Sequence, residues 1–136
     1  MILFDTSVLS RAFRRSQPGS PVKQLRLNVE ELLKEDIPLG ITGLVLQELL
    51  TGIRAEQQFE QLQSTLLGAF EIVHPTTDDH VEAARLKNRC FAKGFNVSGP
   101  DCLIAVVTIA GNHELFAIDK DFTAVAKIAP LKLYTP

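Results

Sequence analysis

Cysteine is scarce in this sequence, and its two copies form no recognisable binding pattern. Cys90 and Cys102 have neither CxxC spacing nor a histidine at ligand spacing, which argues against a zinc site or a disulfide framework. Cys102 lies within an apolar helical pattern and is typical of a core thiol. This usage suits a reducing compartment, so we expect a cytoplasmic protein.

Long apolar runs and an excess of one charge are also lacking. No stretch approaches the roughly 20 apolar residues of a membrane helix, and the start MILFDTSV lacks the features of a signal peptide. We therefore expect no membrane association. The net charge of −2 gives no overall basic field, so a nucleic-acid binder would need a local basic patch. The 136 residues fit one domain, 1–136.

Short apolar runs alternate with helical patterns along the chain. The expected strands are 2–4, 38–42, 70–73, 114–118 and 131–134. The expected helices are 6–15, 22–35, 43–53, 55–69, 78–93 and 98–110, with a short one after 119. Such alternation predicts an α/β fold, with helices on both faces of a parallel sheet.

Acidic residues stand where the carboxyl ends of this sheet would lie. Asp5 follows the first strand, Asp119 follows the strand 114–118, and Asp101 opens a helix. Glu48 lies in mid-helix beside an apolar stripe. Ligands of such sheets bind at the carboxyl ends, where the topology changes direction. Converging carboxylates are stabilised by hard divalent cations, so we expect Mg²⁺ or Mn²⁺.

Each acid also has a purely structural interpretation. Asp5 and Asp119 can cap the helices that follow them, and Asp101 can be a first-turn acid behind a Ser98 cap. Glu48 can occupy an exposed helix face. The three histidines are scattered and do not support cleavage by a histidine pair.

Four stretches in order resemble the PIN domain, most closely the VapC-type toxins of toxin–antitoxin pairs. They are ILFDTSVL, LQELLTG, GPDCLIAVVTIAGN and LFAIDKDF, and together they span nearly the whole chain. The resemblance implies a three-layer α/β/α sandwich around a short parallel sheet. It also implies an endoribonuclease that uses Mg²⁺ or Mn²⁺ and cleaves RNA.

The resemblance assigns roles to particular residues. Asp5, Glu48, Asp101 and Asp119 match the acids that bind metal and carry catalysis, with Thr6, Ser7 and Asp121 as supporting residues. Arg11, Arg14 and Arg15 follow the first acid and are candidate RNA phosphate contacts, or simply a solvated helix face. The implied partners are an RNA substrate, a cognate antitoxin and a second copy of the chain. The apolar helices between 44 and 67 match the part that the family uses for dimerisation.

One position departs from the family pattern. Ala117 stands where the family commonly has Thr or Ser, two residues before the fourth acid. This leaves open a PIN-fold binding module with little or no nuclease activity. A receiver-like signalling domain that binds Mg²⁺ is a further alternative, but it needs an aspartate at the end of the third strand, where FEIVHP offers none.

Overall fold

Four short parallel strands form one sheet in the order β3-β2-β1-β4. The structure is a computed structural model that describes residues 1–12 and 21–136, and the side chains of all of these except 21–23. The strands are β1 (Ile2–Phe4), β2 (Leu39–Thr42), β3 (Glu71–Val73) and β4 (Glu114–Phe116). The helices are α1 (Thr6–Ala12), α2 (Pro21–Lys34), α3 (Gly43–Leu50), α4 (Glu56–Ala69), α5 (Thr77–Ala92), α6 (Gly99–Ala110) and α7 (Lys120–Ala126).

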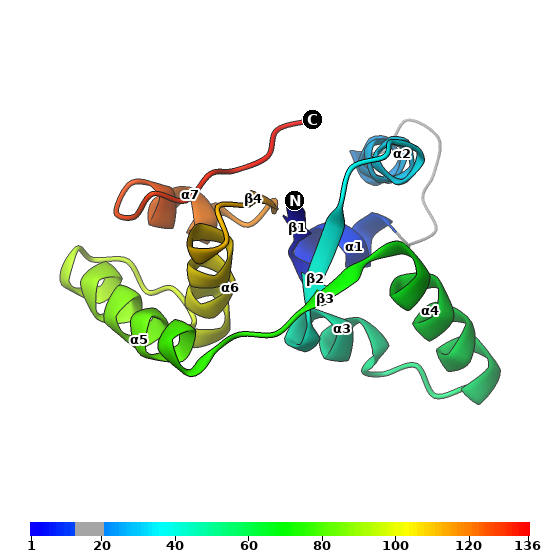
Figure 1. Cartoon of the computed structure of the whole chain (residues 1–136), viewed down its shortest axis with the longest axis horizontal. Helices are drawn as coiled ribbons and strands as arrows, with labels where there is room; N and C mark the ends of the chain where they lie inside the picture. The colour runs from blue at the N-terminus through cyan, green and yellow to red at the C-terminus, as the bar shows by residue number, and fades with distance from the viewer. Residues whose placement is uncertain (13–20) are drawn as a thin grey trace.

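The helices cover both faces of the sheet, so the expected α/β/α sandwich is confirmed. Figure 1 shows α1 to α4 on one side of the strands and α5, α6 and α7 on the other. The chain places β2 and then β3 on one side of β1, and it then crosses back to place β4 on the other side of β1. The direction of the topology therefore changes between β1 and β4, which is where such sheets bind ligands.

The central strands are buried on both faces, as their continuous apolar runs predict. Every residue of β1 and β2 is buried. The ring of Phe4 packs against Phe70 and Phe116, with ring centroids 5.2 and 5.4 Å apart. Phe116 in turn packs against Tyr134 near the end of the chain. These aromatic contacts fix the ends of β1 and β4, from which the site is built.

The expected last strand is reduced to a single bridge. Leu133 pairs with Leu115 of β4. The backbone N–H of Leu115 donates to Lys132 O at 2.9 Å, and that of Tyr134 donates to Leu115 O at 2.8 Å. On its other side, β4 pairs with β1 at all three of its residues.

Helix ends follow the caps visible in the sequence. Thr76 and Asp79 form a capping box at the start of α5, and Ser98 caps α6. Gly94 ends the α5 segment with a φ of +87°, a conformation that glycine adopts without strain. In the part of the chain that the structure describes, no helix combines the length and the apolar character needed to cross a bilayer.

Candidate metal centre

Asp5 lies at the carboxyl end of β1, and its residue is only 7% exposed. Its Oδ2 accepts hydrogen bonds from the backbone N–H of Ser7 at 3.1 Å and from the Ser7 hydroxyl at 2.5 Å. Asp5 therefore does cap the first turn of α1, as its structural interpretation predicts. A cap places the carboxylate at the rim of the sheet, so this role is compatible with metal binding.

Ser7 connects the two strands that flank the topological switch. Besides its bond to Asp5, its Oγ accepts a hydrogen bond from the backbone N–H of Ile118 at 3.4 Å. Ile118 follows β4, so one hydroxyl bridges the β1–α1 and β4–α7 junctions. These contacts hold Asp5 close to the segment that carries Asp119.

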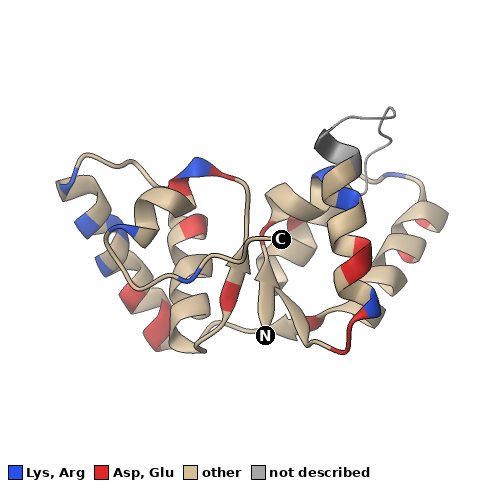
Figure 2. Cartoon of the chain, turned by 90° about the horizontal axis from the view of Figure 1, so that it is seen from above, with Lys and Arg blue, Asp and Glu red and all other residues tan. Residues whose placement is uncertain are grey.

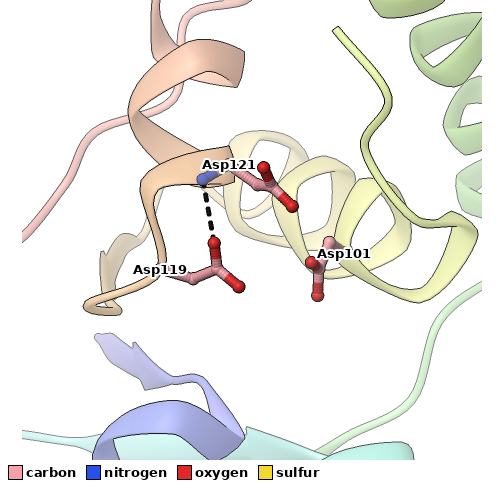
Figure 3. Close-up of side chains that lie close together, drawn as sticks. All are labelled: Asp101, Asp119 and Asp121. Atoms are coloured by element: carbon pink, nitrogen blue, oxygen red, sulfur yellow. Dashed lines mark hydrogen bonds between the residues drawn. The ribbon is translucent and has the colours of Figure 1, made fainter.

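Three further carboxylates meet at the start of α6 and α7. One oxygen each from Asp101, Asp119 and Asp121 lies within 4.8 Å of the others, and Figure 3 shows the three side chains gathered between the two helix starts. Ser98 Oγ accepts from the Asp101 N–H at 3.2 Å, and Asp119 Oδ1 accepts from the Asp121 N–H at 2.9 Å. Helix capping thus sets the position of each carboxylate.

Burial and neighbouring negative charge act on Asp101. Its pKa rises from 3.8 to about 6, chiefly through burial and then through the charge of Asp5, with smaller contributions from Asp119 and Asp121. The hydrogen bond to Ser98 acts in the opposite direction. The charge of Asp5 therefore acts on Asp101, which is one of the three converging carboxylates.

Glu48 lies in α3 and is exposed, which agrees with its structural interpretation as a residue of an exposed helix face. Val45 is the fully buried residue of α3 and takes the core-facing position. The exposed carboxylate is nevertheless held, because Thr6 Oγ1 donates a hydrogen bond of 2.8 Å to Glu48 Oε2.

The three candidate arginines are only partly placed. Arg11 lies in the last turn of α1 and is exposed. Arg14 and Arg15 lie outside the described residues. Phosphate binding by this segment stays a prediction.

Asp121 takes a more central place than the sequence predicts. It was expected to support the other acids, and the structure places it among the three that converge. The signal is the spacing of DKD at a helix start, because the cap residue Asp119 accepts a hydrogen bond from the backbone N–H of Asp121 two positions later.

The donor set fits a hard divalent cation. All the converging ligand atoms are carboxylate oxygens, the kind that Mg²⁺ and Mn²⁺ prefer. Among the described residues, no Lys or Arg forms an ion pair with any of these acids. The amino-terminal ends of α1, α6 and α7 supply partial positive charge, which offsets only part of the repulsion.

Comparison with known proteins agrees with this geometry. The family model described as the PIN domain matches residues 2–128. VapBC2 from Rickettsia felis, solved bound to a promoter DNA fragment, has a chain that is 23% identical, with 98% of each chain covered and a TM-score of 0.76. FitAcB from Neisseria gonorrhoeae is 18% identical over 99% of this chain and 97% of its own, with a TM-score of 0.78.

A third neighbour is VapC20 from Mycobacterium tuberculosis, described as a toxin that cleaves the sarcin–ricin loop. It is 18% identical over 91% of this chain and 94% of its own, with a TM-score of 0.65. No curated protein matched by sequence. At these identities the neighbours establish the fold, and the family model covers most of the sequence. The chain therefore belongs to the PIN-domain family.

Proposed function

We propose that this protein is an endoribonuclease dependent on Mg²⁺ or Mn²⁺ and that it acts as the toxin of a toxin–antitoxin pair. The observation that carries the proposal is the group of carboxylates Asp101, Asp119 and Asp121 within 4.8 Å at the switch between β1 and β4, next to buried Asp5. Membership of the PIN family and a neighbour described as an RNA-cleaving toxin support it.

The residues divide into ligands and residues that position them. Asp5, Asp101, Asp119 and Glu48 hold the metal, and Asp121 adds a carboxylate to the same group. Ser7 orients Asp5, and Thr6 orients Glu48. When bound, Mg²⁺ or Mn²⁺ supplies neutralising charge for the phosphodiester and a Lewis acid that lowers the pKa of water.

The chain's own contribution is to place a water and a phosphodiester in line. Water attacks the phosphorus, the bond to the 3′ oxygen breaks, and the products carry a 5′-phosphate and a 3′-hydroxyl. Ser7 orients the Asp5 carboxylate, because its backbone N–H and its hydroxyl both donate to Asp5 Oδ2. Products with a 2′,3′-cyclic phosphate would contradict this mechanism, because they would mean that the 2′-hydroxyl attacked.

The proposed partners are an RNA substrate, a cognate antitoxin and a second copy of the chain, and the proposed compartment is the cytoplasm. Helices α3 and α4 carry the surface assigned to dimerisation. An apolar cavity of about 300 Å³ lies between them, lined by Gly43, Leu46, Gln47, Leu50, Thr51 and Phe59. Light scattering of the purified protein tests for the dimer.

The decisive test compares the wild-type protein with Asp5→Asn in an RNA cleavage assay with Mg²⁺, Mn²⁺ or EDTA. Asparagine caps helices as well as aspartate does, so the variant keeps the fold and loses only the charge. We expect cleavage by the wild-type protein only with metal, and a loss of roughly 100-fold or more in Asp5→Asn. Equal activity of the two folded proteins would show that Asp5 is only a helix cap.

A PIN-fold binding module without nuclease activity is the second candidate. Ala117, between β4 and Asp119, offers no hydroxyl where the family commonly has one. Binding of Mn²⁺ without RNA cleavage in either metal would favour this candidate. Membership of the PIN family sets aside the receiver-like alternative.

A further inference from the structure

A groove with a basic rim lies between the carboxyl-terminal ends of α5 and α7. We call it the basic groove. Its cavity of about 420 Å³ is lined by Arg89, Ala92, Lys93, Phe95, Lys127 and Ile128. Arg89, Lys93 and Lys127 are exposed, and the ring of Phe95 is partly open, with 36% of the residue exposed.

The charge of this groove is of one sign. No acidic residue lines it, and within the described ranges none of its three cations forms an ion pair. Figure 2 shows basic segments along the second half of α5 and acidic segments at its first turns. Asp78, Asp79 and Glu82 line the neighbouring cavity, which shares only Arg89 with the basic groove. In a protein with a net charge of −2, this is a local concentration of positive charge.

The wall of the groove is fixed by specific contacts. The Phe95 N–H donates to Cys90 O at 2.9 Å, and Lys87 Nζ donates to Val97 O at 2.6 Å. Gly94 supplies the positive φ that turns the chain between them. The ring of Phe95 is therefore presented by a defined connection between α5 and α6.

The basic groove is connected to the carboxylates by α7 and by the chain between α5 and α6. α7 begins at the Asp119 cap and ends at the Lys127 cap, and eight residues at about 1.5 Å each separate the two by about 12 Å. On the other wall, the chain runs from Lys93 through the α5–α6 connection to Asp101. An RNA strand that leaves the carboxylate site can therefore reach the basic groove within a few nucleotides.

We propose that the basic groove binds a single-stranded segment of the RNA substrate beside the cleavage site. The inference rests on the proposed ribonuclease function and adds the path of the substrate. Arg89, Lys93 and Lys127 contact backbone phosphates, which gives affinity without sequence preference. Phe95 offers a ring face on which an unpaired base stacks.

The combination of features favours RNA over an acidic protein segment. An acidic peptide would use the three cations but has no flat bases for the open ring of Phe95. An RNA strand can use both the three cations and the ring of Phe95. It is also held at the carboxylate site, where the phosphodiester is cut. A duplex would keep its bases stacked on one another, so the ring favours a single strand.

The electrostatic part is tested with the double variant Lys93→Ala, Lys127→Ala and the matched control Lys34→Ala, Lys132→Ala. Both remove two positive charges. Lys34 precedes β2 and Lys132 bonds Asn112 before β4, so the control acts at the opposite edge of the sheet. All are made in the Asp5→Asn protein, and binding of a labelled 12-nucleotide RNA is measured by fluorescence anisotropy at several salt concentrations.

We expect the groove variant to bind about tenfold more weakly at low salt, and the slope of log K against log salt to fall by about 1.4. The control should keep the slope of the parent. Phe95→Leu keeps an apolar side chain but removes the flat ring, and it should weaken binding by about tenfold without changing the salt slope. Equal loss in the groove and control variants would overturn the proposal.

Two further outcomes are decisive. Poly-L-glutamate that displaces the RNA as well as unlabelled RNA of equal charge would overturn the assignment to RNA and point to an acidic protein partner. Cleavage by the protein with Asp5 intact is measured separately. If this protein cuts no RNA with Mg²⁺ or Mn²⁺ while the groove variants still lose RNA affinity, the proposed nuclease activity is wrong. RNA binding by the basic groove is then still supported.

Discussion

Thr6 Oγ1 donates a hydrogen bond of 2.8 Å to Glu48 Oε2, and this bond joins the start of α1 to the middle of α3. The two residues are separated by 42 positions in the sequence. Glu48 is exposed, and an exposed glutamate normally samples several rotamers. The bond to Thr6, the residue that follows Asp5, restrains the exposed carboxylate, so a contact rather than burial holds Glu48 in place.

Replacement of Thr6 by valine tests this positioning role. The change keeps the branched shape and removes the hydroxyl, so we expect cleavage to fall about tenfold while stability changes by less than about 1 kcal/mol. Thr65→Val is the matched control, because the Thr65 hydroxyl donates to the Gln61 carbonyl within α4 and lies on its exposed surface. Equal rates of RNA cleavage in the two variants would remove Thr6 from the site.

Ser7→Ala should destabilise the fold as well as the site. The change removes the hydroxyl partner of a carboxylate that is only 7% exposed, and also the acceptor for the Ile118 N–H. A poorly solvated carboxylate that loses a hydrogen bond costs about 1–3 kcal/mol. Urea unfolding measures the loss, with Thr65→Ala as a surface control expected within about 0.5 kcal/mol. A Ser7→Ala midpoint equal to that of the control would contradict the bridging role.

Without metal, the stability of the protein should fall as the pH rises from about 4 to about 6. The folded pKa of Asp101 is raised to about 6 from 3.8, so the folded state binds more protons than the unfolded state in this window. Asp101→Asn should remove this slope and be more stable by roughly 1 kcal/mol at pH 7, after allowance for solvent screening of a half-buried group. Unfolding in EDTA across this pH range is the measurement. Asp36→Asn, in the exposed turn before β2, should keep the slope.

Magnesium should stabilise the folded protein, and Asp121 should contribute to the effect. At a concentration 100 times its dissociation constant, a ligand that binds only the folded state adds about 2.7 kcal/mol. Asp121→Asn keeps the backbone bond to Asp119, removes one charge from the cluster, and should lose most of this gain. Glu60→Gln, on the exposed face of α4, should keep it. Thermal unfolding with and without Mg²⁺ compares them, and an unchanged gain in Asp121→Asn would exclude it from the metal site.

The parallel sheet and the meeting of Asp101 with Asp119 could be predicted because both follow from simple patterns. Unbroken apolar runs such as Ile2–Phe4 indicate buried parallel strands, and the carboxyl ends of such strands lie at one edge. The orientation of Glu48 could not be predicted. Apolar side chains occupy five of the eight positions of GLVLQELL and lie on more than one side of the helix, so the helical period does not identify which face is inward.

The contacts that position these side chains could also not be predicted from the sequence. The bonds from Thr6 to Glu48 and from Ile118 to Ser7 join segments whose relative placement depends on the packing of the whole sheet. The last predicted strand failed for a related reason. Its residues have strand character, but the structure pairs only Leu133 of this segment with β4.

The pairing of β1 with β4 brings together the first and nearly the last structured parts of the chain. A ribosome that has released residues 1–110 has already made Asp5, Glu48 and Asp101, but not the strand that aligns them with Asp119 and Asp121. The carboxylate cluster therefore cannot assemble until β4 and the start of α7 have been synthesised. A chain truncated before β4 keeps Asp5, Glu48 and Asp101 but lacks two of the three converging carboxylates.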